Sequence, residues 1–205
     1  MPLTLDQPTP TVLHGLSWAS YRQLRADAEP SVRMTFDNGT LEIMPPISMG
    51  HGRRTHLLAC LVQTYMDHVG VVYEGIDVVT LEREDLLRGC EGDRMYYVRA
   101  TPPPLDVEEL DLLIHDAPDL VIEVDLSSRS VDKEPLYAAF GVTELFRLER
   151  DTLRLRHLTG NTYEDVDVSG LLPGLDVPLL REHVALRPVL PQREIVRRWR
   201  GCLGG

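Results

Sequence analysis

Hydrophobic residues recur with two different periods along the chain, and the two periods predict different elements. Between residues 48 and 69 the apolar positions follow helical spacing and form one broad stripe, which predicts a long helix packed on a sheet. A shorter helix is predicted after Ser17, because Trp18 and Tyr21 follow at helical spacing and the serine can cap the first turn. Elsewhere the pattern is typical of strands.

Two alternating runs flank Asp37-Asn38-Gly39, whose residue types favour the tight turn of an antiparallel hairpin. The run DLVIEVDL, residues 119–126, is nearly continuous in branched apolar residues, as expected of a central strand covered on both faces. Further strands are predicted for residues 70–81, 94–100, 143–150 and 152–160. By contrast, residues 83–93 are expected to form a polar turn, and the proline-rich, acidic residues 101–117 a long surface excursion.

The stretch KEPLYAAFG predicts a helix that Asp132 caps and Gly141 ends. Strands interleaved with helices indicate an α/β or α+β fold, with a mixed β-sheet flanked by helices and an N-terminal helix and hairpin. We divide the chain into an arm, residues 1–16, one domain, residues 17–185, and a basic C-terminal helix or tail, residues 186–205.

Charge and cysteine content narrow the possible functions. A formal net charge of −11 opposes tight, charge-driven binding to nucleic acid, although a bound Mg²⁺ would add local positive charge. The odd number of cysteines, Cys60, Cys90 and Cys202, without CxxC spacing, argues for a reducing compartment and against a structural zinc site. No signal peptide or apolar run of about 18 residues is visible, so we expect a cytoplasmic protein without a membrane span.

Two carboxylates lie inside the most apolar strand of the chain. Side chains alternate along a strand, so Glu123 and Asp125 share a face at its C-terminal end. Burying ionised carboxylates without partners costs several kcal/mol, of order ~5, so a positive group is expected nearby. A divalent cation, Lys133, or both would serve, and a purely structural Glu123–Lys133 ion pair is the plainer alternative.

Asp93 stands at the start of another apolar strand. If that strand pairs beside residues 119–125, Asp93 and Glu123 converge on one point, where carboxylates, backbone carbonyls and water could bind Mg²⁺ or Mn²⁺. Such a metal polarises a phosphodiester and lowers the pKa of an attacking water. Lys133 could then orient that water, which is phosphodiester hydrolysis in outline.

The sequence resembles a known family over about residues 17–185. The resemblance rests on SWASYRQL, RMTFDNGTLEIMPPISMGH, GCEGDRMYYV and above all APDLVIEVDLSSRSVDKEPLYAAFGVTELFRLE. These motifs are similar to those of the Uma-two family of restriction endonucleases, within the PD-(D/E)xK nuclease superfamily. The resemblance implies a restriction-endonuclease-like core.

Carried over residue by residue, the resemblance implies that Asp93 and Glu123 are metal ligands. It also implies that Lys133, on the following helix, takes the role that the superfamily gives to a lysine at position 125, where Asp125 stands here. Gly92 replaces the proline of the motif, which should loosen the turn without removing a ligand. The expected activity is Mg²⁺-dependent cleavage of nucleic acid, preferentially DNA, by a homodimer; the alternative is a nuclease-fold binding or regulatory protein that cleaves nothing.

Three accessory candidates remain open at this stage. Gly52 stands where many relatives carry an acid, and Glu42, on a neighbouring strand, is a possible substitute. His51, near a helix start, fits a cap or surface residue more readily than a general base. Asp125 either supports the site as a further acid or accepts hydrogen bonds from the serines 127–128, and the second interpretation is slightly favoured.

Overall fold

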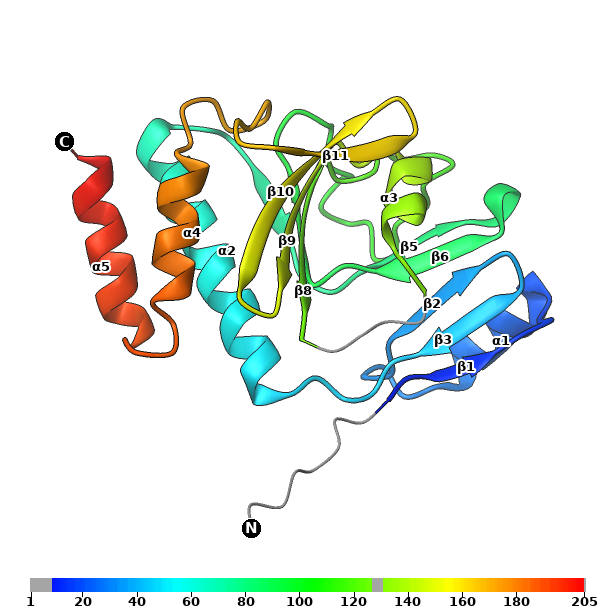
Figure 1. Ribbon diagram of the computed structural model, residues 1–205. Coiled ribbons are helices and arrows are strands. Elements are labelled where there is room, and N and C mark those ends of the chain that lie inside the picture. The colour runs from blue at the N-terminus through cyan, green and yellow to red at the C-terminus, as the bar shows by residue number, and fades with distance from the viewer. Residues whose placement is uncertain (1–8, 127–130, 205) are drawn as a thin grey trace, which may run out of the picture.

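A computed structural model of the chain describes residues 9–126 and 131–204. These residues form two β-sheets and five α-helices (Figure 1), which confirms the predicted α/β fold class, although the division into two sheets was not predicted. The helices are α1 (Trp18–Asp27), α2 (Met49–Val69), α3 (Glu134–Phe140), α4 (Val177–Ala185) and α5 (Gln192–Leu203), with a 3₁₀ turn η1 (Glu84–Leu86). None of the described helices combines the length and apolarity that a membrane crossing requires.

The larger sheet has six strands in the order β11-β10-β9-β8-β7-β4. Its strands are β4 (Glu74–Ile76), β7 (Arg94–Tyr97), β8 (Leu120–Asp125), β9 (Glu144–Glu149), β10 (Thr152–Thr159) and β11 (Thr162–Val166). β8 is central, parallel to β9 and antiparallel to β7, so the sheet is mixed. The two-sided burial predicted for this strand is confirmed, because all of its residues except the last are buried.

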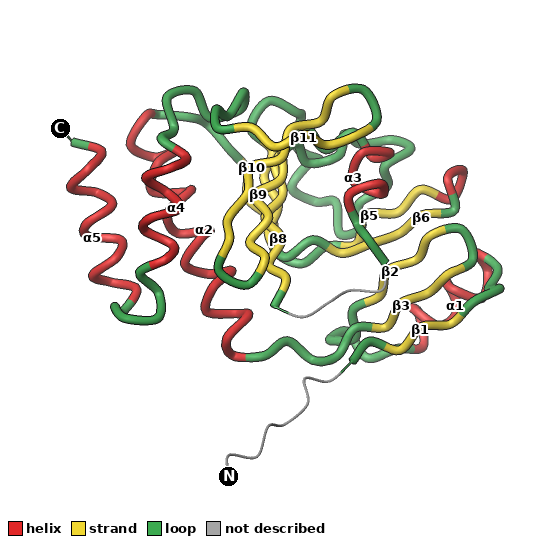
Figure 2. Tube along the Cα trace, viewed as in Figure 1, coloured by secondary structure: helices red, strands yellow, loops and turns green. Residues whose placement is uncertain are grey.

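The smaller sheet has five antiparallel strands in the order β1-β3-β2-β6-β5. Its strands are β1 (Thr11–Leu13), β2 (Met34–Asp37), β3 (Thr40–Ile43), β5 (Thr80–Arg83) and β6 (Arg88–Glu91). The hairpin predicted at residues 37–39 joins β2 to β3, and Asn38 and Gly39 both adopt positive φ, as a type I′ turn requires. Figure 2 shows the two sheets as separate groups of yellow strands.

Helices cover both faces of the six-stranded sheet (Figure 1). α2, α4 and α5 lie on one face, where Leu120, Ile122 and Val124 of β8 join their apolar side chains in the largest core. α3 covers the opposite face, where Val121 packs with the side chains of α3, including Tyr137. The alternation along β8 therefore directs Glu123 and Asp125 to the α3 side.

One of the two predicted helix caps, Ser17, is confirmed, and the other, Asp132, differs; Ser48, predicted only as the start of a helix, is also a cap. Ser17 and Ser48 accept hydrogen bonds from backbone N–H groups at the first turns of α1 and α2. At α3, however, Lys133 occupies the N-cap position, and Asp132, one residue earlier, accepts from the N–H of Glu134 at 3.2 Å. Gly141 ends α3 with a positive φ of 85°, as predicted.

Several sequence-based expectations are corrected. Residues 70–81 do not form one strand: β4 and β5 belong to different sheets. Residues 83–93 are not only a polar turn, because β6 pairs with both β2 and β5. β1 and α4 were not predicted, being a three-residue strand and a nine-residue helix. The proposed division into arm, domain and tail stays a prediction.

Candidate active site

The pairing of β7 with β8 brings Asp93 beside Glu123. Arg94 lies opposite Ile122 in the antiparallel register, so Asp93, one residue before β7, reaches the C-terminal half of β8. There its Oδ2 accepts a hydrogen bond from the backbone N–H of Val124 at 2.8 Å. The strand pairing on which the predicted convergence depends is therefore present.

Asp93 is almost fully buried, with 3% of its surface exposed, and the side chains of an arginine and a histidine contact it. Arg33 Nη1 lies 2.8 Å from Oδ1, and His51 Nε2 lies 3.1 Å from Oδ2. Burial by itself raises the pKa of Asp93, but the hydrogen bond from His51 and the charge of Arg33 outweigh it and lower that pKa below its ordinary value. Asp93 is thus held as a carboxylate.

Ser48 places His51 at this carboxylate, because its cap fixes the first turn of α2. The sequence favoured a cap or surface role for His51. In the structure its ring instead contacts Asp93, so the imidazole is part of the site.

Glu123 is equally buried, and its partners come from the start of α3. Lys133 Nζ lies 3.1 Å from Glu123 Oε1, and the Tyr137 hydroxyl donates a hydrogen bond to the same oxygen. The amine of Lys133 also donates to the main-chain oxygen of Glu91. Lys133 therefore links Glu123 on β8 to the turn that carries Asp93, and the Glu123–Lys133 pair expected from the sequence is present.

Arg33 holds the same turn from the other sheet. Its Nη2 donates to the main-chain oxygen of Glu91 at 3.2 Å, and its Nε lies 3.6 Å from the carboxylate of Glu91. Burial raises the pKa of Glu91, against the opposing charges of Arg33 and Lys133. The positive side chains Arg33 and Lys133, together with the imidazole of His51, thus contact a cluster of buried carboxylates.

The sequence analysis missed Arg33, Glu91 and Tyr137. A signal for Arg33 exists: it lies two residues before the buried Thr35 and so shares its face of β2. A buried arginine needs an acidic partner, which points across to the acids at residues 91–93. No comparable signal marks Tyr137, whose spacing fits the apolar face of a helix equally well.

Asp125 has a different partner from Glu123 although both side chains project from one face of β8. Its Oδ2 lies 3.2 Å from Arg147 Nε, and Arg147 also contacts Glu134 and Glu149. Burial lowers the pKa of Arg147, but these carboxylates outweigh it and raise that pKa. The hydrogen bonds proposed to serines 127–128 lie outside the described residues.

Glu42 lies on the five-stranded sheet and is fully buried. The register places Glu42 opposite Thr35. The main-chain oxygen of Arg33 accepts a hydrogen bond from the N–H of Met44 at 2.9 Å, which extends the pairing of β2 with β3. Glu42 therefore lies on the face of the sheet that carries Arg33. Its accessory role stays a prediction.

The oxygen donors here suit Mg²⁺ or Mn²⁺ in chemical type. Asp93 and Glu123 supply carboxylates, whereas the main-chain oxygen of Glu91 already accepts hydrogen bonds from Lys133 and Arg33. Among residues 9–126 and 131–204, no group of three or more His, Cys, Asp or Glu side chains is arranged to hold a metal ion. A cation would therefore use two carboxylates and complete its shell with water and substrate, as Mg²⁺ commonly does.

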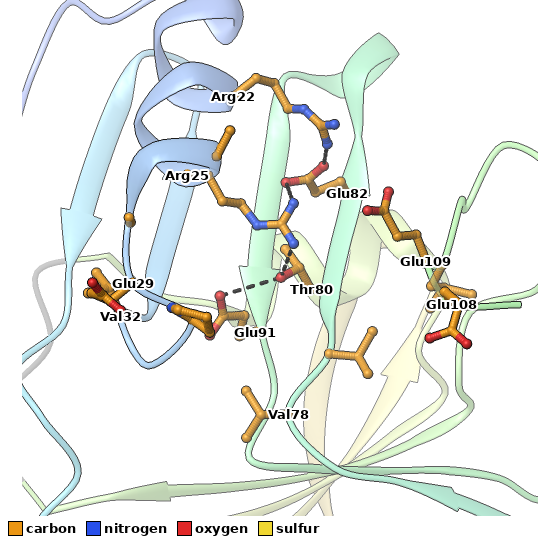
Figure 3. A pocket seen from close by; sticks show the side chains of 15 residues that line it. Arg22, Arg25, Glu29, Val32, Val78, Thr80, Glu82, Glu91, Glu108 and Glu109 are labelled. Carbon is orange, nitrogen blue, oxygen red and sulfur yellow. Dashed lines mark hydrogen bonds and ion pairs between the residues drawn. The ribbon is translucent and has the colours of Figure 1, made fainter.

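A cavity of about 490 Å³ lies on the far side of Glu91, between α1, β5 and residues 108–110 (Figure 3). Five glutamates and two arginines line it, a formal charge of −3. Both arginines, Arg22 and Arg25, already contact Glu82. Such a lining repels phosphate, so this cavity does not fit the path of a nucleic-acid backbone.

Comparisons with known proteins bear on the family and on the fold. The family model Uma2, described as "Putative restriction endonuclease", matches residues 18–188. A solved structure from Anabaena variabilis, described as a "putative nuclease belonging to DUF820", superposes with a TM-score of 0.55 at 15% identity, covering 82% of this chain and 99% of that one. No curated protein matches the chain.

The structural likeness concerns the fold alone, whereas the family match spans most of the sequence. It includes both strands that carry Asp93 and Glu123 and the helix start that carries Lys133. The chain therefore belongs to the Uma2 family, the "Putative restriction endonuclease" family of nucleases.

Proposed function

We propose that the chain is a divalent-metal-dependent endonuclease that hydrolyses phosphodiester bonds of nucleic acid, with DNA as the preferred substrate. Asp93 and Glu123 hold Mg²⁺ or Mn²⁺, and Lys133 assists the attacking water. The observation that carries the proposal is that Asp93 is bonded to the N–H of Val124, the residue after Glu123, while Lys133 contacts Glu123 itself. The carboxylates of Asp93 and Glu123 come from adjacent strands, and their cationic partners are buried with them.

The bound metal would supply charge stabilisation for the phosphate and a lowered pKa for the attacking water. Lys133 offers a compact positive charge with three donors, of which Glu123 and the Glu91 carbonyl take two directions. The water oxygen bonds to phosphorus, one ester P–O bond breaks, and the departing oxygen takes up a proton.

His51 holds Asp93 in place during this reaction, and Tyr137 holds Glu123. Asp125 and Glu42 are further accessory acids in the proposal, the former through Arg147. Cutting both strands of a duplex needs two such sites, so we propose a homodimer. Cytoplasmic location belongs to the same proposal, on the ground of the three cysteines without CxxC spacing.

The test is incubation of plasmid and single-stranded DNA with the purified protein and Mn²⁺. Glu123→Gln should lower the cleavage rate at least about 100-fold. Removing a metal ligand is expected to reduce the activity more than removing a residue that only hydrogen-bonds to a ligand. Glu164→Gln removes the same charge from an exposed position on β11 and should cut like wild type. Cleavage that is undiminished in Glu123→Gln would show another active site or a contaminant.

A second candidate is a nuclease-fold protein that binds or regulates without cutting. It is favoured by the partners of both carboxylates, because Arg33 balances the charge of Asp93 and Lys133 that of Glu123 without any metal. Titration calorimetry with Mn²⁺ separates the two candidates. Millimolar or tighter binding that Asp93→Asn abolishes supports the nuclease, and absence of binding by wild type supports the second candidate.

A further inference from the structure

Arg33 belongs to the five-stranded sheet but makes its contacts at the edge of the other sheet. It directly precedes β2, and only 7% of its surface is exposed. Its guanidinium contacts Asp93, at 2.8 Å, and Glu91, through the main-chain oxygen at 3.2 Å and the carboxylate at 3.6 Å. One side chain thus reaches both ends of the turn that leads into β7.

The contact with Asp93 lies where a metal would have to bind. Arg33 approaches Oδ1, while His51 and the Val124 N–H both approach Oδ2. A coordinating cation needs a carboxylate lone pair at about 2.1 Å, closer than a guanidinium comes, and would repel the guanidinium across that oxygen. Oδ1 therefore serves either Arg33 or the metal well, but not both.

The contacts with Glu91 allow Arg33 to release Asp93 without leaving the site. A guanidinium presents five donors in a fixed fork and remains charged at physiological pH. When its Nη1 loses Asp93, the hydrogen bond from Nη2 to the Glu91 carbonyl can persist and the carboxylate of Glu91 still balances the charge. Lys133 differs, because its carboxylate partner, Glu123, is itself a proposed ligand.

We propose that Arg33 is a positioning residue that stands in for the divalent cation: it holds and neutralises Asp93 in the metal-free protein and competes with the metal for that carboxylate. This inference rests on the proposed metal site. Arg33 keeps the turn folded without metal, and the affinity for metal is lower than the two carboxylates alone would give. An arginine with only a structural role would instead support metal binding, and its removal would weaken it.

The sign of the change in metal affinity is the test. Arg33→Gln keeps an amide donor for the Glu91 carbonyl and removes the charge. Its dissociation constant for Mn²⁺, measured by calorimetry, should fall about tenfold relative to wild type, and Mn²⁺ should raise its melting temperature more than that of wild type. Arg33→Lys keeps the charge and should bind Mn²⁺ within about threefold of wild type. Arg83→Gln, on β5 and paired with Asp85, is the matched control and should not differ from wild type.

The outcomes separate this inference from the proposed function. If wild type binds no Mn²⁺, both the metal-dependent function and the proposed competition between Arg33 and the metal are overturned. If wild type binds Mn²⁺ and Arg33→Gln binds it equally or more weakly, only the role of Arg33 is overturned.

A measurement on wild type covers the case in which Arg33→Gln does not fold. The guanidinium NMR signals of Arg33, assigned with Arg33→Lys, should shift and exchange faster as Mg²⁺ is added, because the contact with Asp93 is lost. Mg²⁺ binding that leaves these signals unchanged overturns the inference.

Discussion

At the scale of single residues, the partner of each acid decides what the acid can do. Glu123 and Asp125 project from one face of β8, and Asp93 lies beside Glu123. Asp125 contacts Arg147, Glu123 contacts Lys133, and Asp93 contacts Arg33 and His51. Asp93 and Glu123 form the proposed metal site because their cationic partners could yield to a metal. Asp125 belongs to an ion-pair network on the same face of β8.

The lowered pKa of Asp93 predicts a stability that depends on pH. A folded-state pKa below the ordinary value near 3.8 stabilises the protein fully above that value, and the contribution is lost as the pH falls below it. At pH 7, Asp93→Asn should reduce the free energy of unfolding by about 3 kcal/mol, because Arg33 loses its closest buried acid. Urea unfolding of both proteins should show this difference shrinking below about pH 4.

Asp106→Asn controls for the loss of one carboxylate, since Asp106 is exposed in the segment between β7 and β8. It should match wild type at every pH. A difference between wild type and Asp93→Asn that stays constant down to pH 3 (about one unit below the ordinary pKa) would contradict the assignment of an ionised Asp93.

Sequence reasoning reached Asp93, Glu123 and Lys133 because two acids and a lysine are conspicuous around an apolar strand. It placed His51 only as an accessory candidate, and it missed Arg33 and Tyr137. Arg33 stands about 60 residues from its partners, Glu91 and Asp93, so no local spacing joins them. Tyr137 is at a position where an aromatic ring would pack in any case.

At the scale of elements, the strands that alternate clearly were found and the short or interrupted ones were not. β8, β9 and β10 have six to eight residues and a clear pattern. The sequence predicted a turn at β6, because this strand has only four residues, with a charged residue at each end and Gly89 between them. Its strand conformation comes from pairing with two other strands. β2 is distant in the sequence, and β5 precedes β6 across a turn.

Gly89 shows why β6 carries a glycine. Tyr21 is a buried residue of α1. A Cβ at position 89 would lie 2.6 Å from the hydroxyl oxygen and 3.1 Å from Cζ of this tyrosine. Gly89→Ala should therefore lower the free energy of unfolding by about 1–3 kcal/mol, as overpacking does, when measured by urea unfolding.

The matched change is Gly52→Ala in the first turns of α2, where a Cβ meets nothing within 4 Å. It should raise the free energy of unfolding by up to about 1 kcal/mol, because alanine is the better helix former. Equal effects of the two substitutions would show that the contact with Tyr21 does not restrict position 89.

At the scale of the whole molecule, the acidic surface and the proposed substrate are at odds unless a cation joins them. The net charge is −11, and the cavity beside Glu91 adds carboxylates close to the site. The protein must therefore draw local positive charge from Arg33, Lys133 and a bound metal.

This balance predicts that DNA binding depends on divalent cations. In EDTA, the dissociation constant for a short DNA duplex should be larger than about 10 µM at 150 mM salt, because the protein itself neutralises few phosphates. Ca²⁺, a hard cation that binds carboxylate oxygens, should tighten binding at least about tenfold in fluorescence anisotropy.

The double variant Asp93→Asn/Glu123→Gln provides the comparison. Its binding should not respond to Ca²⁺. Tight binding of wild type in EDTA would place the nucleic acid on another surface and contradict the role of the metal.

The sequence by itself determined the fold class, the central strand with its two carboxylates, the helix cap at Ser17 and the family resemblance. These depend on periodicity and on motifs of neighbouring residues, which one chain displays directly. Only the tertiary structure decided that Arg33 from the second sheet and His51 from the start of α2 meet at Asp93, and that Asp125 turns to Arg147. Such pairings follow from how the two sheets and their helices pack, because a charged side chain selects its partner by distance in space and not by spacing in sequence.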